Sequence, residues 1–115
     1  MELAEAEFEE LVAEALDQVP QELAALMDNV VVLVEEHPPP DDPHLLGLYV
    51  GTPLTERDSS YTFREPDHIL LFRGPLLAMC RSREELVDEV RITVVHEIAH
   101  HFGIDDDRLH ALGYG

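Results

Sequence analysis

The sequence has few features of an exported or membrane-embedded protein. Cys80 is the only cysteine, so no internal disulfide bond can form, which is typical of a protein in a reducing cytoplasm. No apolar run approaches the ~18 residues that a membrane-spanning helix needs. Residues 1–5 are acidic in character and lack both the basic start and the apolar core of a signal peptide. We therefore expect a cytoplasmic protein that does not enter a membrane.

Basic residues are also scarce. The chain has seven, all of them arginine, against 25 acidic residues, which gives a formal net charge of −18. Such an excess of negative charge repels phosphates, so it argues against nucleic acids and anionic membrane surfaces as partners. We expect most of the acidic residues to form solvated helix faces. A basic partner or peptide remains a second interpretation of the same charge.

The pattern of hydrophobic residues predicts a single α+β domain over residues 1–115. With 45% hydrophobic residues, the chain can bury one modest core. Apolar residues at three-to-four spacing indicate an amphipathic helix that Pro20 ends, and short apolar runs indicate strands. The continuous run at residues 30–34 is typical of a strand buried on both faces. The expected order is a helix at 4–19, a short helix at 21–27, strands at 30–34, 46–51 and 68–73, and loops at 37–43 and 52–67, with Gly74-Pro75 closing the last strand.

A long helix is predicted after Ser82. Ser82 and Glu85 form a capping-box pattern that starts it, and Gly103 ends it because glycine takes a left-handed conformation at little cost. A further short helix with an acidic first turn is expected at residues 105–112. The long helix has a predicted core stripe of Leu86, Val87, Val90, Val94, Ile98 and Phe102, and a predicted polar face of Glu89, Thr93, His96 and His100.

The polar face carries a motif that indicates a metal-binding and catalytic site. His96 and His100 are four residues apart, so both imidazoles lie on one side of the helix and can reach a single metal ion. Glu97, turned by about 100° from His96, is placed to accept a proton from water as a general base. With Gly103 and Asp106 the motif is H-E-x-x-H-x-x-G-x-x-D, which indicates a site for Zn²⁺.

The third protein ligand is sought among the residues after the second histidine. No glutamate follows Glu97, which excludes a glutamate ligand from a later helix. His101 adjoins His100 and points away from the shared face. We favour Asp106, which stands three residues after Gly103, where H-E-x-x-H-x-x-G-x-x-[H/D] enzymes have their third ligand. The alternatives that stay open are His101, Asp105, Asp107 and His110.

The segment from His96 to Asp106 resembles the zincin metallopeptidases, and the chain as a whole is similar to the small bacterial zincin-like metallopeptidase family. The similarity extends to residues 46–51 and to the strand at 67–73 that leads into Gly74-Pro75. It implies a minimal zincin-like α+β fold, in which a small, mostly buried sheet packs on the motif helix with N-terminal and C-terminal helices. It further implies that His96, His100 and Asp106 bind zinc and that Glu97 is the general base.

The sequence departs from larger zincins in two ways. The methionine turn that metzincins place beneath the metal has no counterpart, because Met1, Met27 and Met79 all precede the motif. The chain ends soon after Asp106, so we expect no C-terminal wall of the kind that larger enzymes add to their substrate cleft. An extended substrate could instead add a strand to an exposed sheet edge. For Tyr114 we expect a frayed end rather than a hydroxyl that stabilises an oxyanion.

The sequence thus predicts a zinc-dependent peptidase that hydrolyses a peptide or protein substrate with Glu97 as the base. Two alternatives remain. One is a non-catalytic binding or regulatory protein that keeps the zincin-like scaffold. The other is a metal-dependent amidase that acts on non-peptide substrates, for which the same ligands and base would serve.

Overall fold

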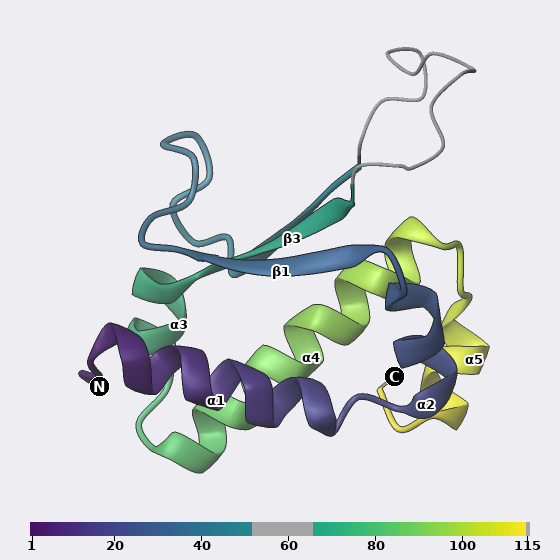
Figure 1. The fold of residues 1–115 in the computed structure, drawn as a ribbon, viewed down its shortest axis with the longest axis horizontal. Helices are drawn as coiled ribbons and strands as arrows, with labels where there is room; N and C mark the ends of the chain where they lie inside the picture. The colour runs from purple at the N-terminus through teal and green to yellow at the C-terminus, as the bar shows by residue number, and fades with distance from the viewer. Residues whose placement is uncertain (52–65, 115) are drawn as a thin grey trace.

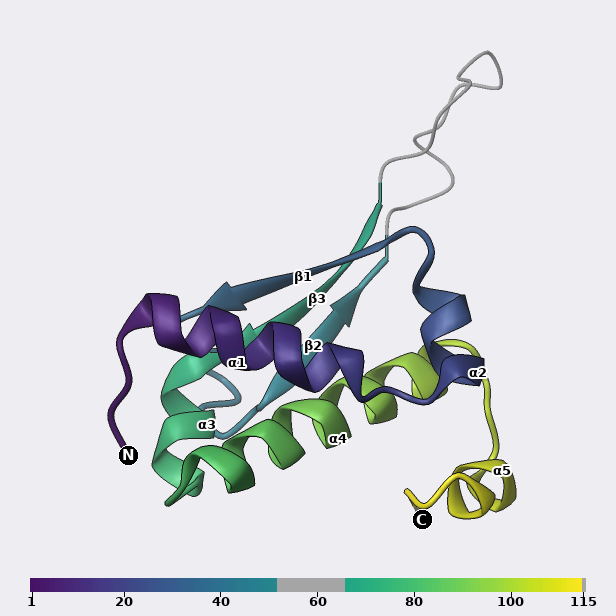
Figure 2. The ribbon, with the colours of Figure 1, turned by 60° about the horizontal axis from the view of Figure 1, so that its bottom comes forward.

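Helices cover one face of a small mixed sheet in the computed structural model of the chain, which describes residues 1–51 and 66–114 (Figure 1). In a second view, α1 and α4 again lie side by side on the same side of the strands (Figure 2). This arrangement confirms the predicted α+β class. Along the chain the elements are α1 (Glu5–Asp17), α2 (Gln21–Ala24), the 3₁₀ turn η1 (Ala25–Met27), β1 (Val30–Glu35), β2 (Gly47–Val50), β3 (Asp67–Phe72), α3 (Arg73–Met79), α4 (Arg83–His101) and α5 (Asp106–Ala111).

The described strands form a sheet in the order β1-β3-β2. The central strand β3 pairs in parallel with β1, where Val32 lies opposite Ile69. It pairs antiparallel with β2, where Tyr49 lies opposite Ile69. Because β2 is an edge strand, its backbone groups that do not face β3 are turned outward. On that side it contacts α4, the helix that carries the histidine motif.

The core lies between the inner face of the sheet and the two long helices. Each fully buried aliphatic side chain there contributes roughly 1.5–3 kcal/mol relative to leaving it exposed, so this interior holds α4 firmly against the strands. The residues that are 0% exposed include Phe8, Leu11 and Ala15 of α1, Ile69 and Leu71 of β3, and Leu86, Val90, Val94, Val95 and Ile98 of α4.

The outer face of the sheet is uncovered, which corrects the prediction that the first strand is buried on both faces. β1 alternates between half-buried and exposed positions, and Val31 and Leu33 are 39% and 41% exposed. Among the described residues, no helix lies over that face (Figures 1 and 2). A continuous apolar run fits both a doubly buried strand and a strand whose outer side chains stay apolar but exposed, so the pattern alone could not separate them.

The helix α3 was missed by the sequence pattern, which indicated only that Gly74-Pro75 closes a strand. Pro75 lies in the first turn of α3, where its missing N–H removes no helical hydrogen bond. Cys80, which ends this helix, is 1% exposed, as is common for a free cysteine. The loop predicted at 52–67 lies outside the described residues as far as residue 65, and Asp67 already belongs to β3.

Candidate metal centre

Capping at both ends sets the length of α4 and with it the position of the motif. At the start, the Ser82 hydroxyl accepts a hydrogen bond from the Glu85 N–H at 3.1 Å, as the capping box predicted. At the end, Gly103 takes a φ of +67° and the N–H of Ile104 donates to the Ala99 carbonyl at 2.9 Å. This Schellman arrangement stops the helix directly after the motif and turns the chain toward α5.

The buried face of α4 is wider than the predicted stripe, because it also includes Thr93, Val95 and Ala99. Phe102, predicted to be core, is 43% exposed and lies edge-on to the Tyr49 ring at a centroid distance of 6.3 Å. Thr93, predicted on the polar face, is only 8% exposed and lies against Gly47 of β2. His96 and His100 are exposed, so the motif histidines lie on a face that the core does not occupy.

His96, His100 and Asp106 line one pocket of about 710 Å³ between α4 and α5. Asp105 lies just before α5, and its carboxylate accepts a hydrogen bond from the Arg108 N–H at 2.8 Å. That carboxylate therefore caps the helix, while Asp106 in the first turn of α5 lies at the pocket. The other lining residues are Ile104, Asp107, Leu109, His110 and Tyr114, so two of the alternative ligands, Asp107 and His110, share the pocket.

Imidazole and carboxylate groups are the donors that zinc accepts in catalytic sites, so the residue types around this pocket fit the ion. Within residues 1–51 and 66–114, no group of three or more His, Cys, Asp or Glu side chains lies close enough together to hold a metal ion. His96, His100 and Asp106 are all exposed, so packing does not fix their rotamers. Convergence of these three side chains on one metal ion would therefore require them to rotate from their present positions.

Tyr114 lies against the first motif histidine. The Nε2 atom of His96 is 3.3 Å from the Tyr114 carbonyl oxygen. The N–H of Tyr114 donates to the Leu109 carbonyl at 2.8 Å, and the Arg91 guanidinium lies 5.9 Å from the centre of the Tyr114 ring. The expectation of a frayed end is thus wrong at this residue. Its carbonyl competes with any metal for the His96 Nε2 atom.

Glu97 is turned toward β2 and is not among the described residues that line the pocket. Its Oε1 accepts a hydrogen bond from the Tyr49 N–H at 2.9 Å. The Tyr49 hydroxyl donates to Oδ2 of Asp67 at 2.7 Å, and Asp67 is only 7% exposed. The Tyr49 ring stacks on His101 at a centroid distance of 3.8 Å, so His101 does point away from the other histidines, as expected. Tyr49 and Asp67 therefore belong to the surroundings of the motif.

Tyr49 lies in a predicted strand but was not predicted to belong to the site, although the sequence around it carries a signal. Gly47 and Gly51 flank Tyr49 at two-residue spacing, so all three residues lie on the same side of the strand. Glycine inside a strand often marks a place where another segment approaches closely. Here the approaching segment is α4. A Cβ atom added to Gly47 would lie 2.6 Å from Cγ2 of Thr93.

Ion pairs join the site helices to the N-terminal helices. Arg108 of α5 donates from Nε to the Glu22 carboxylate of α2 at 2.7 Å. This hydrogen bond lowers the pKa of the Glu22 carboxyl group and raises the pKa of Arg108. Arg83 of α4 pairs with Glu14 of α1 at 2.7 Å. All four side chains are exposed, so these pairs orient the helices and add little to the free energy of unfolding.

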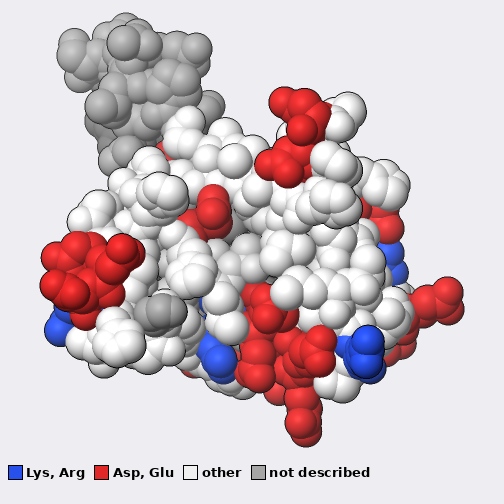
Figure 3. Space-filling model, turned by 180° about the vertical axis from the view of Figure 1, so that it is seen from behind, with Lys and Arg blue, Asp and Glu red and all other residues white. Residues whose placement is uncertain are grey.

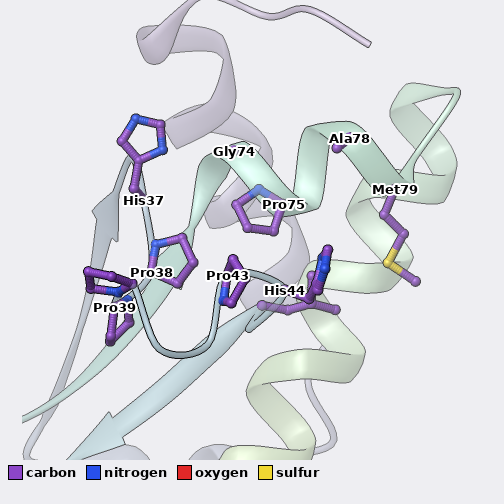
Figure 4. A pocket seen from close by; sticks show the side chains of 11 residues that line it. His37, Pro38, Pro39, Pro43, His44, Gly74, Pro75, Ala78 and Met79 are labelled. Atoms are coloured by element: carbon purple, nitrogen blue, oxygen red, sulfur yellow. The ribbon is translucent and has the colours of Figure 1, made fainter.

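A second cavity, of about 760 Å³, lies next to the start of α3 (Figure 4). His37 and His44 contribute nitrogens, and the rest of the lining is prolines, Gly74 and the apolar side chains of Leu46, Ala78 and Met79. This cavity has neither a carboxylate nor a residue of the histidine motif. The pocket at the end of α4 is therefore the candidate site that has both histidine and carboxylate side chains. Cys80 adds no nucleophile, because burial raises the pKa of its thiol to about 11.

The exposed surface carries the negative charge that the composition predicts. Asp and Glu side chains stand out from several parts of the face shown in Figure 3, and Arg side chains are fewer. Within the described residues, no helix is both long enough and apolar enough to cross a bilayer.

Comparison with known proteins agrees with the fold. One similar solved structure is a conserved hypothetical protein from T. thermophilus, which is 27% identical and superposes with a TM-score of 0.55 over 87% of this chain and 94% of the other. No curated protein matches the sequence significantly. Residues 27–115, which include the whole motif and its pocket, match the model of the family described as zincin-like metallopeptidase. The chain therefore belongs to the zincin-like metallopeptidase family.

Proposed function

We propose that the protein is a zinc-dependent peptidase, with His96, His100 and Asp106 as the metal ligands and Glu97 as the general base. The observation that carries the proposal is that three side chains of the types that zinc binds, from two helices, line one pocket. Bound zinc would supply a Lewis acid that polarises the scissile carbonyl and makes a water molecule more acidic. Membership of the zincin-like family supports the same class of reaction.

The protein's own residues would handle the proton. Glu97 would accept it from the attacking water and return it to the leaving amine. Its side chain is half-buried, and one carboxylate oxygen is held by the Tyr49 N–H, which leaves the other oxygen for this task. The net charge of −18 favours the approach of basic peptides over acidic ones by long-range attraction. A single buried cysteine fits activity in a reducing cytoplasm.

Metal content is the first test. Protein that has been exposed to zinc and desalted should retain one zinc per chain, and removal of zinc by a chelator should lower its melting temperature. His96→Ala and His100→Ala should each reduce zinc retention strongly. His37→Ala is the matched control, because His37 lines the other cavity, and it should retain zinc as the wild type does. A wild-type protein that takes up no zinc would exclude both the ligand set and the peptidase.

Activity is the second test. The zinc-loaded protein should cleave members of a peptide library, and Glu97→Gln should lose roughly 10²–10⁴-fold of that activity while it keeps zinc. Glu89→Gln, the same change two turns earlier on α4, should behave as the wild type does. Full activity in Glu97→Gln would show that another group is the base. Turnover of small amides without cleavage of any peptide would instead indicate a metal-dependent amidase.

A non-catalytic binding or regulatory domain is the second candidate. One contact favours it: the Nε2 atom of His96 lies at the Tyr114 carbonyl, 3.3 Å away, rather than toward the other donors. If that contact persists in solution, added zinc should leave the amide resonance of Tyr114 unchanged and should bind weakly or not at all. Tight zinc binding with a shift of that resonance would exclude a zinc-free form of this candidate, and cleavage of peptides by the zinc-loaded protein would exclude the candidate itself.

A further inference from the structure

β2 follows α4 in a regular register. Gly47 lies against Thr93, and a Cβ added to Gly51 would lie 3.6 Å from Cε1 of His101. Between these two contacts, the Tyr49 N–H bonds to Glu97. Successive contacts are two residues apart on the strand and four residues apart on the helix. These spacings correspond to about 6.6 Å along the strand and about 6 Å along the helix axis, so they nearly match. The match keeps strand and helix in contact over the whole length of β2.

The same register explains why the Tyr49 N–H is available to Glu97. The Leu46 carbonyl accepts a hydrogen bond from the Phe72 N–H at 3.0 Å, so the backbone groups of Leu46 point toward β3. In an antiparallel pair these directions alternate, so Leu48 and Val50 also face β3. The backbone groups of Tyr49 point the other way, toward α4. Glu97 is the side chain of α4 that reaches them.

Tyr49 is in turn fixed by its own side chain. Its hydroxyl bonds to the buried carboxylate of Asp67 at 2.7 Å, and its ring stacks on His101 with an angle of 15° between the ring planes. Asp67 lies on the central strand, and its N–H donates to the Asn29 carbonyl at 3.0 Å. The contacts thus run from the central strand through Tyr49 to the carboxylate of Glu97.

We propose that Tyr49 is a positioning residue for Glu97. Its main-chain N–H holds one carboxylate oxygen in a single orientation, and its hydroxyl and ring keep that N–H in place. Tyr49 itself does not touch the reacting atoms. The role of Glu97 as a base rests on the proposed function. The hydrogen bond from the Tyr49 N–H to the Glu97 carboxylate does not depend on whether the protein is an enzyme. The two claims are therefore tested by different measurements.

Amide hydrogen exchange tests the hold directly in the metal-free protein. Glu97→Ala removes the acceptor, so the Tyr49 amide should exchange on the order of tenfold faster, corresponding to loss of one ordinary hydrogen bond. Glu97→Gln retains a side-chain oxygen at this position and should keep the amide protected. In both variants the amides of Leu48 and Val50, which pair with β3, should exchange at wild-type rates. Equal exchange of the Tyr49 amide in wild type and Glu97→Ala would overturn the proposal.

Removal of the side-chain anchor tests the positioning role. Tyr49→Phe keeps the ring and the main chain but loses the bond to Asp67, so the Tyr49-position amide should exchange severalfold faster. Cleavage by this variant should show kcat reduced about tenfold, with KM and zinc content unchanged, because one hydrogen bond that orients the base is lost. Asp67→Ala should have the same effect, and the double variant should be no worse than either single variant.

Two outcomes would overturn this role. A raised KM with an unchanged kcat in Tyr49→Phe would make Tyr49 a substrate-binding residue. Additive losses in the double variant would show that the hydroxyl and the Asp67 carboxylate act separately. If the wild type proves to have no hydrolytic activity, the proposed function fails, and amide exchange in Tyr49→Phe and Glu97→Ala still decides whether Tyr49 holds the carboxylate.

Discussion

The substitution Gly47→Ala provides a stringent test of the contact between β2 and α4. The added Cβ would lie 2.6 Å from Cγ2 of Thr93 and 3.2 Å from the Leu70 carbonyl oxygen. Neither neighbour can move easily, because Thr93 is 8% exposed on a packed helix and the Leu70 oxygen belongs to the central strand. Forcing one extra methyl group into such a site costs about 1–3 kcal/mol.

A smaller effect opposes this cost. Alanine has fewer unfolded conformations than glycine, and where the native backbone suits alanine this stabilises the fold by about 0.4–1 kcal/mol. Gly47 has no positive φ, so the gain applies there. We expect a net loss of about 1–2 kcal/mol, which for a domain of this size lowers the melting temperature by about 4–8 °C. Thermal unfolding followed by circular dichroism would measure it.

Gly51→Ala is the matched control. It makes the same chemical change four residues further along the chain, where the new Cβ would lie 3.6 Å from Cε1 of His101, an ordinary van der Waals distance. This variant should be as stable as the wild type or slightly more so. In Gly47→Ala/Thr93→Ser the obstructing Cγ2 is removed, so the two substitutions should together cost less than the sum of their separate effects. If Gly47→Ala and Gly51→Ala melt within a degree of each other, β2 does not approach α4 as closely as described.

Three further outcomes follow from individual residues. Gly103→Ala should destabilise the fold by about 1–2 kcal/mol because the residue sits at a φ of +67°, and Gly103→Asn should cost less; urea unfolding would compare them. The Cys80 thiol, with its pKa raised from 9.0 to about 11, stays protonated in the fold while the unfolded chain ionises. Stability should therefore fall by up to about 2–3 kcal/mol as pH rises through that interval, and a Cys80→Ala variant should lack that part of the decline. Zinc that binds His96 through Nε2 must displace the Tyr114 carbonyl, so the Tyr114 amide resonance should shift in step with zinc occupancy; occupancy without a shift would contradict the contact.

The elements that the sequence predicted well are those set by neighbours along the chain. The capping box at Ser82, the left-handed Gly103 and the four-residue spacing of His96 and His100 are local features, and together they define the motif helix and its ends. Which face of the sheet stays open is not local, since the side chains of residues 30–34 are equally apolar on both sides. The burial of Thr93 could not be predicted from its neighbours in the sequence either, because it depends on how closely β2 approaches α4.

The contact between Tyr49 and Glu97 joins residues 48 positions apart, so no short-range pattern could reveal it. The spacing of Gly47 and Gly51 indicated only that some segment comes close to the strand. The sequence could not identify α4 as that segment, because the contact depends on the order of the strands. β2 lies at the edge of the sheet, and this position leaves one side of it open to α4. The proximity of Asp106 to the two histidines could be predicted from the sequence. Gly103 ends the helix three residues after His100 and turns the chain back, so the residues that follow lie near the motif.

The two halves of the candidate site are organised to different degrees, and this difference has a functional consequence. The Glu97 carboxylate is anchored to the sheet through Tyr49, whereas His96, His100 and Asp106 are exposed and do not converge on one point. Ordering the three ligand side chains costs conformational entropy that zinc binding must offset, but orienting the base costs nothing further at that moment. Loss of a ligand should therefore weaken zinc binding without changing exchange of the Tyr49 amide, while loss of the Tyr49 hydroxyl should do the reverse. A site in which each change altered both measurements would be a single cooperative unit, and the base would then not be positioned in advance of the metal.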